Sequence, residues 1–190
     1  MTAPDEHLRA DAVRNRAALL EAAAEVLATA PDASLAEVAA RAGLGRATLY
    51  RHFENRDALL AGIQAEVLAR AAEALAAADL PGCDTREGLR RAAGALVPLG
   101  TRFRILLTEG ADADPEFLAA RDQTLAPLLA LLERGRAAGE ISPTASIAWL
   151  GLALAGLLMT AVRAAAAGLI DPADAGELVA ASLLDGFGRG

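Results

Sequence analysis

The chain has 190 residues, of which 54% are apolar, and a formal net charge of −7. This length and composition suit one or two compact domains and exclude global disorder. Every basic residue is arginine and alanine is abundant, so helix propensity is high along most of the chain. Glycine, proline and Asp/Asn turn signals divide the chain into about nine helices, and we expect an all-α fold.

The cysteine and histidine content leaves little metal or disulfide chemistry. Cys83 is the only cysteine, so an internal disulfide is impossible, and only His7 and His52 accompany it. No ordinary structural zinc set can be assembled from these residues, and we expect no metal and no cofactor. Cys83 lies in a Pro-Gly turn, where an incidental loop cysteine is the favoured interpretation and a redox sensor the alternative.

The first eleven residues are polar and mixed in charge. They predict a short arm rather than a secretory signal, which favours a cytoplasmic protein. Residues 141–162 carry no charge, and about 20 apolar residues are enough to span a bilayer. Polar residues erode the start of this run, Glu140 precedes it in place of a basic flank, and we expect a buried helix rather than a membrane span.

The first predicted helix runs from near Asp11 to Ala30, with Leu20, Ala23, Ala24 and Leu27 on one face. A second helix begins at Ser34, because Ser34-Leu-Ala-Glu37 fits a capping box.

Gly43-Leu-Gly45 closes the second helix, and a third is predicted from Arg46 to Phe53. Two short helices joined by a glycine turn have the spacing of a helix-turn-helix, whose second helix lies in the major groove of DNA.

Helical geometry assigns the two faces of the third helix. Leu49 and Phe53 are four residues apart and face inward, which projects Ala47, Thr48 and Arg51 outward, with Tyr50 and His52 on the flanks. From Arg41 to Arg56 there are four arginines and one carboxylate, although the whole chain is acidic. This concentration of positive charge favours a DNA-binding surface over the alternative of an ordinary solvated helix face.

The stretch VAARAGLGRATLYRHFENRDALL, residues 38–60, resembles the DNA-binding signature of the TetR family of bacterial transcriptional regulators. Residues 16–23 look like that family's first helix, and the two stretches together cover about a third of the chain. Two positions depart from the pattern: Gly45 stands where serine or threonine is common, and Leu35 replaces a frequent hydroxyl residue. Each departure removes a possible phosphate contact.

The resemblance implies that Thr48, Tyr50, His52 and Arg56 contact DNA, Tyr50 and His52 mainly at the phosphates. A bidentate guanidinium can read the O6 and N7 of guanine; Arg46 is the first candidate for this and Arg51 the second. Ser34 can offer its backbone N–H to a phosphate. The expected DNA-contacting set is Ser34, Gly45, Arg46, Ala47, Thr48, Tyr50, Arg51, His52 and Arg56.

A helix over about residues 55–78 is predicted to link a DNA-binding domain, residues 1–56, to a helical regulatory domain, residues 57–190. Residues 84–190 contain no recognisable catalytic or nucleotide-binding motif, and we expect no enzymatic activity. The resemblance implies an effector pocket between helices of this half and a dimer interface made by its last two helices.

The pocket candidates are the few large or polar side chains among alanines and leucines, and ordinary core packing is the alternative for each. They are Phe103, Phe117, Gln123, Trp149, Met159 and Thr160. The dimer candidates are a face of small side chains and two apolar residues of the last helix: Ala148, Gly151, Ala155, Val179 and Leu183.

We therefore predict a homodimeric repressor that binds a palindromic operator in double-stranded DNA and is released by a small-molecule effector. The alternative is a constitutive or protein-regulated DNA-binding protein without an inducer. The sequence names neither the effector nor the operator.

Overall fold

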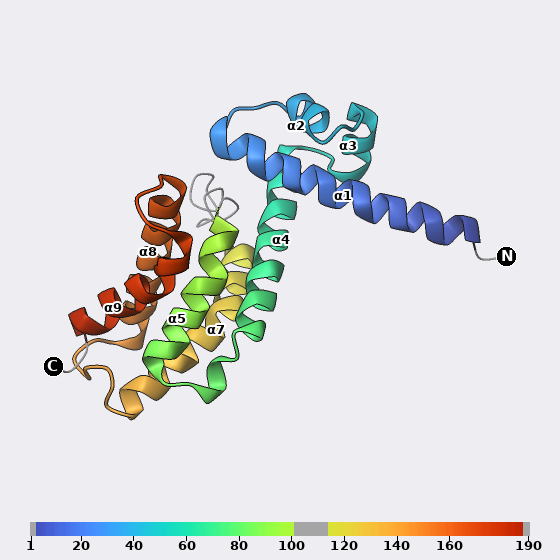
Figure 1. The fold of residues 1–190 in the computed structure, drawn as a ribbon. Coiled ribbons are helices and arrows are strands. Elements are labelled where there is room, and N and C mark those ends of the chain that lie inside the picture. Colours follow the sequence, from blue (N-terminus) through green and yellow to red (C-terminus); the bar gives the residue numbers. More distant parts are fainter. Residues whose placement is uncertain (1–2, 101–113, 188–190) are drawn as a thin grey trace. The chain divides into compact units, whose positions relative to one another are not determined.

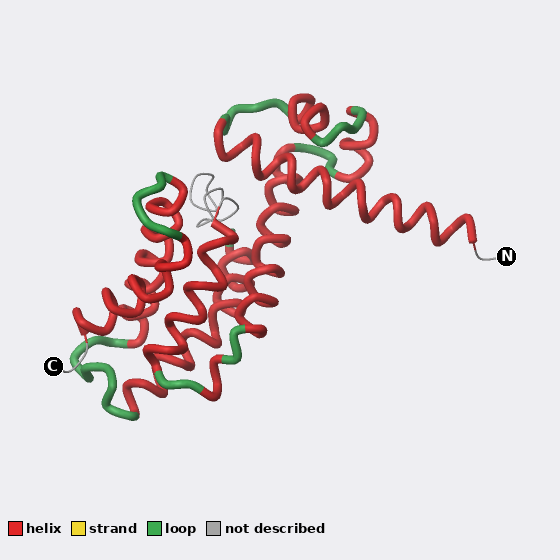
Figure 2. Tube along the Cα trace, in the orientation of Figure 1, coloured by secondary structure: helices red, strands yellow, loops and turns green. Residues whose placement is uncertain are grey.

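The computed structural model describes residues 3–100 and 114–187, and the side chains of 11–100 and 114–186. Within these ranges there are eight α-helices and no strand (Figures 1 and 2), which confirms the predicted all-α class. The chain divides into two compact units, Met1–Glu66 and Val67–Gly190. Phe103 lies outside the described residues.

The first unit consists of α1 (Ala3–Thr29), α2 (Leu35–Arg41), α3 (Arg46–His52) and the beginning of α4 (Arg56–Ala77). Both α2 and α3 pack on α1 (Figure 1). The prediction of an arm over the first eleven residues is wrong, because α1 already begins at Ala3. The only helix-breaking residue there, Pro4, lies in the first turn, where its missing N–H has no intrahelical partner to lose.

The core of the first unit is made by side chains that all four helices contribute. Its buried members include Leu19, Leu20, Ala23, Val38, Leu49, Phe53, Leu59 and Ile63. The boundary between the two units lies inside α4, between Glu66 and Val67, whereas the sequence places it at residue 56. An uninterrupted helix of 22 residues is therefore shared by both units.

The second unit is a bundle of α5 (Thr85–Leu96), α7 (Pro115–Ala137), α8 (Ile147–Ala166) and α9 (Ala175–Phe187), joined by the remainder of α4. Each of α5, α7, α8 and α9 packs on the next, and α9 returns to α5. Single 3₁₀ turns at Leu80–Gly82, Val97–Leu99 and Pro172–Asp174 redirect the chain.

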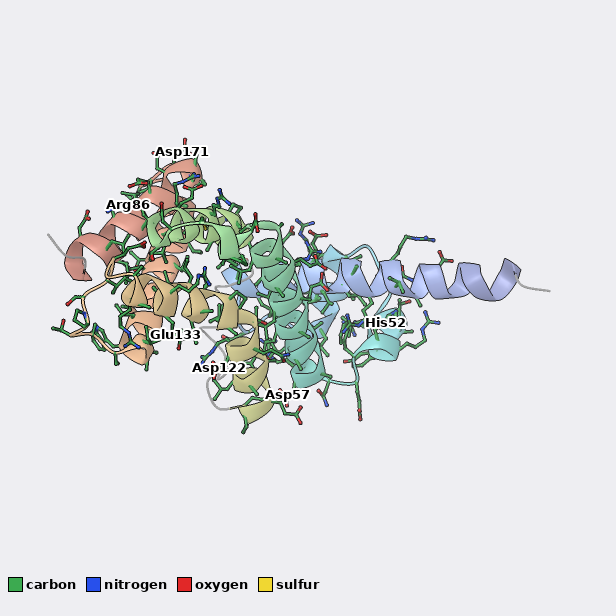
Figure 3. All side chains as sticks on the ribbon, turned by 90° about the horizontal axis from the view of Figure 1, so that it is seen from below. His52, Asp57, Arg86, Asp122, Glu133 and Asp171 are labelled. Carbon is green, nitrogen blue, oxygen red and sulfur yellow. The ribbon has the colours of Figure 1, made fainter. Side chains whose placement is uncertain are left out.

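The pairing of α5 with α9 is a close one. A Cβ atom added at Gly176 would lie 2.5 Å from the backbone oxygen of Arg90, so this glycine lets the two helix backbones approach. At the rim, Arg86 donates to Glu177 at 3.3 Å and to Asp185 at 3.1 Å (Arg86 is labelled in Figure 3). These ion pairs are exposed and contribute little to stability compared with the buried residues of the seam.

Helix α8 is long and apolar enough to cross a membrane by length and composition, the only such helix in the part of the chain described. The sequence predicts a buried helix. The structure buries one face, with Leu150 and Leu154 in the core, and leaves the other exposed, including Trp149 at 56% and Leu152 at 70%. Four of its 20 residues are buried, so the prediction is wrong for most of the helix within a single chain.

Candidate nucleic-acid interface

Ser34 fixes where α2 begins. Its hydroxyl accepts a hydrogen bond from the backbone N–H of Glu37 at 3.3 Å, and its own N–H donates to the Glu37 carboxylate at 2.7 Å. The predicted capping box is therefore confirmed. The Ser34 hydroxyl also donates to the Glu37 carboxylate, at 2.7 Å. The backbone N–H and the hydroxyl of Ser34 hold the pKa of Glu37 below its ordinary value, because both donate to the charged carboxylate.

A glycine turn then leads from α2 into α3. Gly43 has φ +69°, a left-handed conformation that ordinary side chains rarely adopt. The Leu44 N–H closes the end of α2 by donating to the Ala39 carbonyl at 2.9 Å. Gly45 is the N-cap of α3 and supplies no side-chain cap, so the missing hydroxyl noted in the sequence leaves the first turn of α3 open to other acceptors.

The inner face of α3 holds the helix on the unit. Leu49 is fully buried and Phe53 is 3% exposed, as the four-residue spacing predicts. The Arg16 guanidinium of α1 lies over the Phe53 ring, 5.5 Å from its centroid, a distance at which a cation is attracted to an aromatic face. These contacts set the rotation of α3 about its axis and so decide which side chains face away from the protein.

The outer face of α3 carries the predicted DNA-contacting side chains. Arg46, Ala47, Tyr50 and Arg51 are exposed, and Arg51 donates to the Thr48 hydroxyl at 3.3 Å. Thr48 and His52 are half-buried, and His52 ends the helix (Figure 3). The structure therefore gathers on one short helix every predicted residue from position 45 to 52.

Two of the four arginines of this segment, Arg41 and Arg56, bond to parts of the protein outside α3. Arg41 pairs with Glu25 of α1 at 2.6 Å. Arg56 donates through Nη1 to the Ala33 carbonyl at 2.8 Å and through Nη2 to the Pro31 carbonyl. The positive charge that the outer face of α3 itself presents comes from Arg46 and Arg51.

The predicted effector residues are not brought together. Phe117 is buried, Trp149 and Thr160 are exposed on α8, and Met159 is half-buried. Gln123 alone lines an open groove of about 360 Å³ between α4 and α7. The groove is walled mainly by small side chains, which carry no signal in the sequence: Leu68, Ala69, Ala72, Ala76, Ala120, Gln123, Thr124 and Pro127.

The predicted dimer residues divide into two groups. Ala148 and Ala155 are exposed on α8 and Gly151 is half-buried there. Val179 and Leu183 are 2% and 1% exposed, because the stripe of α9 that contains them packs into the core of its own chain. These two side chains are therefore core residues, and Leu178, 45% exposed, is the large apolar residue that α9 exposes among its described side chains.

Residues 19–63 match the family described as bacterial regulatory proteins, tetR family. The transcriptional repressor LfrR of Mycolicibacterium smegmatis is 36% identical over 110 residues, 57% of this chain and 58% of that protein. The aligned stretch thus spans little more than half of that curated relative.

Solved structures align over more of the chain. The TetR-like transcriptional regulator LfrR from Mycobacterium smegmatis in complex with proflavine superposes with a TM-score of 0.77 at 28% identity, over 93% of this chain and 98% of that one. A TetR family transcription regulator from Marinobacter aquaeolei gives a TM-score of 0.74 at 27% identity, over 97% and 100%. The likeness extends through both compact units.

Proposed function

Because this chain belongs to the TetR family of bacterial regulatory proteins, we propose that it binds double-stranded DNA through α2 and α3 and regulates transcription. The observation that carries the proposal is the outer face of α3, where Arg46, Tyr50 and Arg51 project from a helix locked by Leu49 and Phe53. A rigid, exposed and basic helix of this kind fits the major groove.

The side chains of this face divide by chemistry. Tyr50 and His52 can each donate a hydrogen bond to a phosphate oxygen, which fixes register without reading sequence. Arg46 is the candidate for bidentate contact with guanine. It lies in the first turn of α3 and has no hydrogen-bond or ion-pair partner among the described residues. Arg51 already donates to Thr48, so the two side chains would act on DNA as one preorganised pair.

We further propose that the protein acts as a homodimer on a palindromic operator. One seven-residue helix reads only a few base pairs, and a two-fold pair would read two half-sites. The exposed apolar face of α8, with Trp149, Leu152 and Ala155, and Leu178 of α9 support a seam between two copies, since exposed apolar patches of this kind mark interaction surfaces.

The dimer is tested by Ala155→Arg, which places a charge at the centre of the α8 face. Size-exclusion chromatography with light scattering is expected to give the monomer mass for this variant and twice that mass for wild type. Ala137→Arg, at an exposed position ending α7, is the matched control. If Ala155→Arg still forms a dimer, α8 is not part of the dimer interface.

A small-molecule effector that releases the DNA is the third part of the proposal. The groove between α4 and α7 supports it, as does the proflavine complex of a structural relative. Release requires only that the effector bind the DNA-incompetent state better, and a coupling of about 1–3 kcal/mol is typical. Proflavine is the probe for binding in the groove. Ala72→Leu, which fills the groove, is expected to weaken proflavine binding. Ala130→Leu, at an exposed position of α7, is the control and should leave proflavine binding unchanged.

If no compound releases the DNA, the alternative of a constitutive or protein-regulated DNA-binding protein is favoured. Either way the protein would act in the cytoplasm, where bacterial DNA is accessible, as a binder and not as an enzyme.

The deciding experiment is binding of the full chain to DNA flanking its own gene, against unrelated DNA at matched salt. A specific site bound at least about a thousandfold more tightly is expected. Arg46→Ala should reduce this ratio, whereas Arg136→Ala, which removes an exposed charge from α7, should not. Two results together would contradict sequence-specific regulation: the wild-type chain binds every part of the flanking region as weakly as unrelated DNA, and a selection from random sequences yields no preferred site.

A further inference from the structure

We infer that Arg56 is a positioning residue that clamps the segment before α2 onto the start of α4, rather than a ligand of DNA phosphate. This role of Arg56 rests on the DNA binding proposed above for its functional consequence. The residue is the first of α4, and its half-buried guanidinium reaches back to the segment that joins α1 to α2.

Two hydrogen bonds make up this clamp. Nη1 donates to the Ala33 carbonyl at 2.8 Å and Nη2 donates to the Pro31 carbonyl. The two acceptors lie 23 and 25 residues earlier in the chain, so the bonds close a loop that contains the whole helix-turn-helix. A guanidinium suits this task because its planar fork presents donors on separate nitrogens, whereas a lysine has a single ammonium nitrogen.

The clamped segment, residues 31–33, leads directly into α2. Ala33, itself 8% exposed, directly precedes Ser34, whose capping box starts the helix. The first turn of α2 is therefore held by Glu37 from inside the helix and by Arg56 from outside. Since α2 packs on α3, and Val38 of α2 and Leu49 of α3 are both fully buried, the placement of α2 helps to set the placement of α3.

The position of Arg56 also makes it a connection along the chain. It lies at the beginning of the one helix that both compact units share. The clamp thus joins that helix to the segment on which the outer face of α3 depends, by two directed bonds in addition to apolar packing.

The test uses the full chain with Arg56→Lys and Arg56→Ala, bound to the operator over a series of salt concentrations. A clamp predicts that Arg56→Lys, which can keep one of the two bonds, loses about tenfold in affinity, the ratio for loss of one charge-assisted hydrogen bond, and that Arg56→Ala, which removes both, loses at least as much. The apparent affinity falls because fewer free molecules hold α2 correctly, and Arg56→Lys keeps the wild-type slope of log affinity against log salt. A phosphate ligand predicts the opposite pattern: Arg56→Lys stays near wild type, and Arg56→Ala loses roughly 0.9 from the slope.

A second measurement requires no DNA and no variant. In NMR spectra of the free wild-type chain, the clamp predicts slowly exchanging Nη protons on Arg56. Rapidly exchanging protons there would overturn the inference even if the variants fail to fold. Protected protons in a chain that binds no DNA would instead contradict the proposed function and leave the clamp in place. Arg51 is the internal control for fast exchange, because its exposed guanidinium bonds only to Thr48 within the part of the chain that the structure describes.

Discussion

The close approach of α9 to α5 at Gly176 gives a specific stability prediction. Gly176→Ala adds a Cβ atom 2.5 Å from the Arg90 carbonyl oxygen, 3.2 Å from Arg90 Cγ and 3.3 Å from the Arg90 carbonyl carbon. Ordinary contact begins at 3.4 Å. Two of the three atoms belong to the backbone of α5, so no rotation of a side chain relieves the overlap, and α9 must move away from α5.

The magnitude follows from two opposing effects. Alanine gains at most about 1 kcal/mol over glycine in a helix interior, and less in the first turn, where Gly176 lies. Overpacking of a buried contact costs about 1–3 kcal/mol, and the separation also loosens the buried seam of Val179, Ala180 and Leu183. We expect a net loss of about 1–2 kcal/mol, or roughly 2–8 °C in Tm for a chain of this size.

Urea unfolding followed by tryptophan fluorescence is the assay, because Trp149 is the only tryptophan and belongs to the second unit. Gly94→Ala in α5 is the matched control: its added Cβ has nothing within 4 Å, and we expect it to stabilise the unit by about 0.5–1 kcal/mol. Gly176→Ala as stable as Gly94→Ala would refute the close approach of the two helices.

Three further variants test the electrostatics and the DNA face. Arg90 and Arg91 lower the pKa of Glu87 to about 2. Its charged form therefore contributes stability that is present above pH 4.5 and lost as pH falls towards 2. Glu87→Gln should reduce the free energy of unfolding at pH 7 and make that free energy depend less on pH between 4.5 and 2. Ser34→Ala should lower the free energy of unfolding by about 1 kcal/mol, because the N-cap is lost. Hydrogen exchange should show reduced protection of the Glu37 amide, and unchanged protection would contradict the role of the cap. Tyr50→Phe should weaken operator binding roughly threefold to tenfold with no change in salt slope, because the phenol is neutral; a changed slope would mean that the helix had shifted.

Local sequence signals predicted the DNA-binding half well. The capping box at Ser34 and the inward pair Leu49 and Phe53 depend on spacings of three and four residues, which helical geometry fixes without help from the rest of the fold. The partners of Arg56 could not be predicted in this way. Its acceptors are backbone carbonyls far back in the chain, and a carbonyl has no sequence signature.

The second unit was harder to predict for a different reason. Leu178 and Val179 are neighbours of similar character, and only the packing of α9 on α5 decides that Val179 is buried and Leu178 exposed. The groove between α4 and α7 exists because alanines leave room, and room is a property of several helices together. Large side chains such as Phe117 and Trp149 drew attention in the sequence, but Phe117 is buried and Trp149 is exposed.

The bare N-cap of α3 has a consequence for how a regulator of this kind would respond. Gly45 has the extended backbone of an ordinary cap, and a Cβ atom there meets nothing within 4 Å. A hydroxyl residue would fit without strain and would add both a cap and a donor for phosphate. In the proposed complex, the chain would therefore hold DNA less firmly than its own backbone permits. A regulator with a looser hold leaves its operator at a lower dose of inducer, so this single missing side chain would make the genetic switch more sensitive rather than simply weaker.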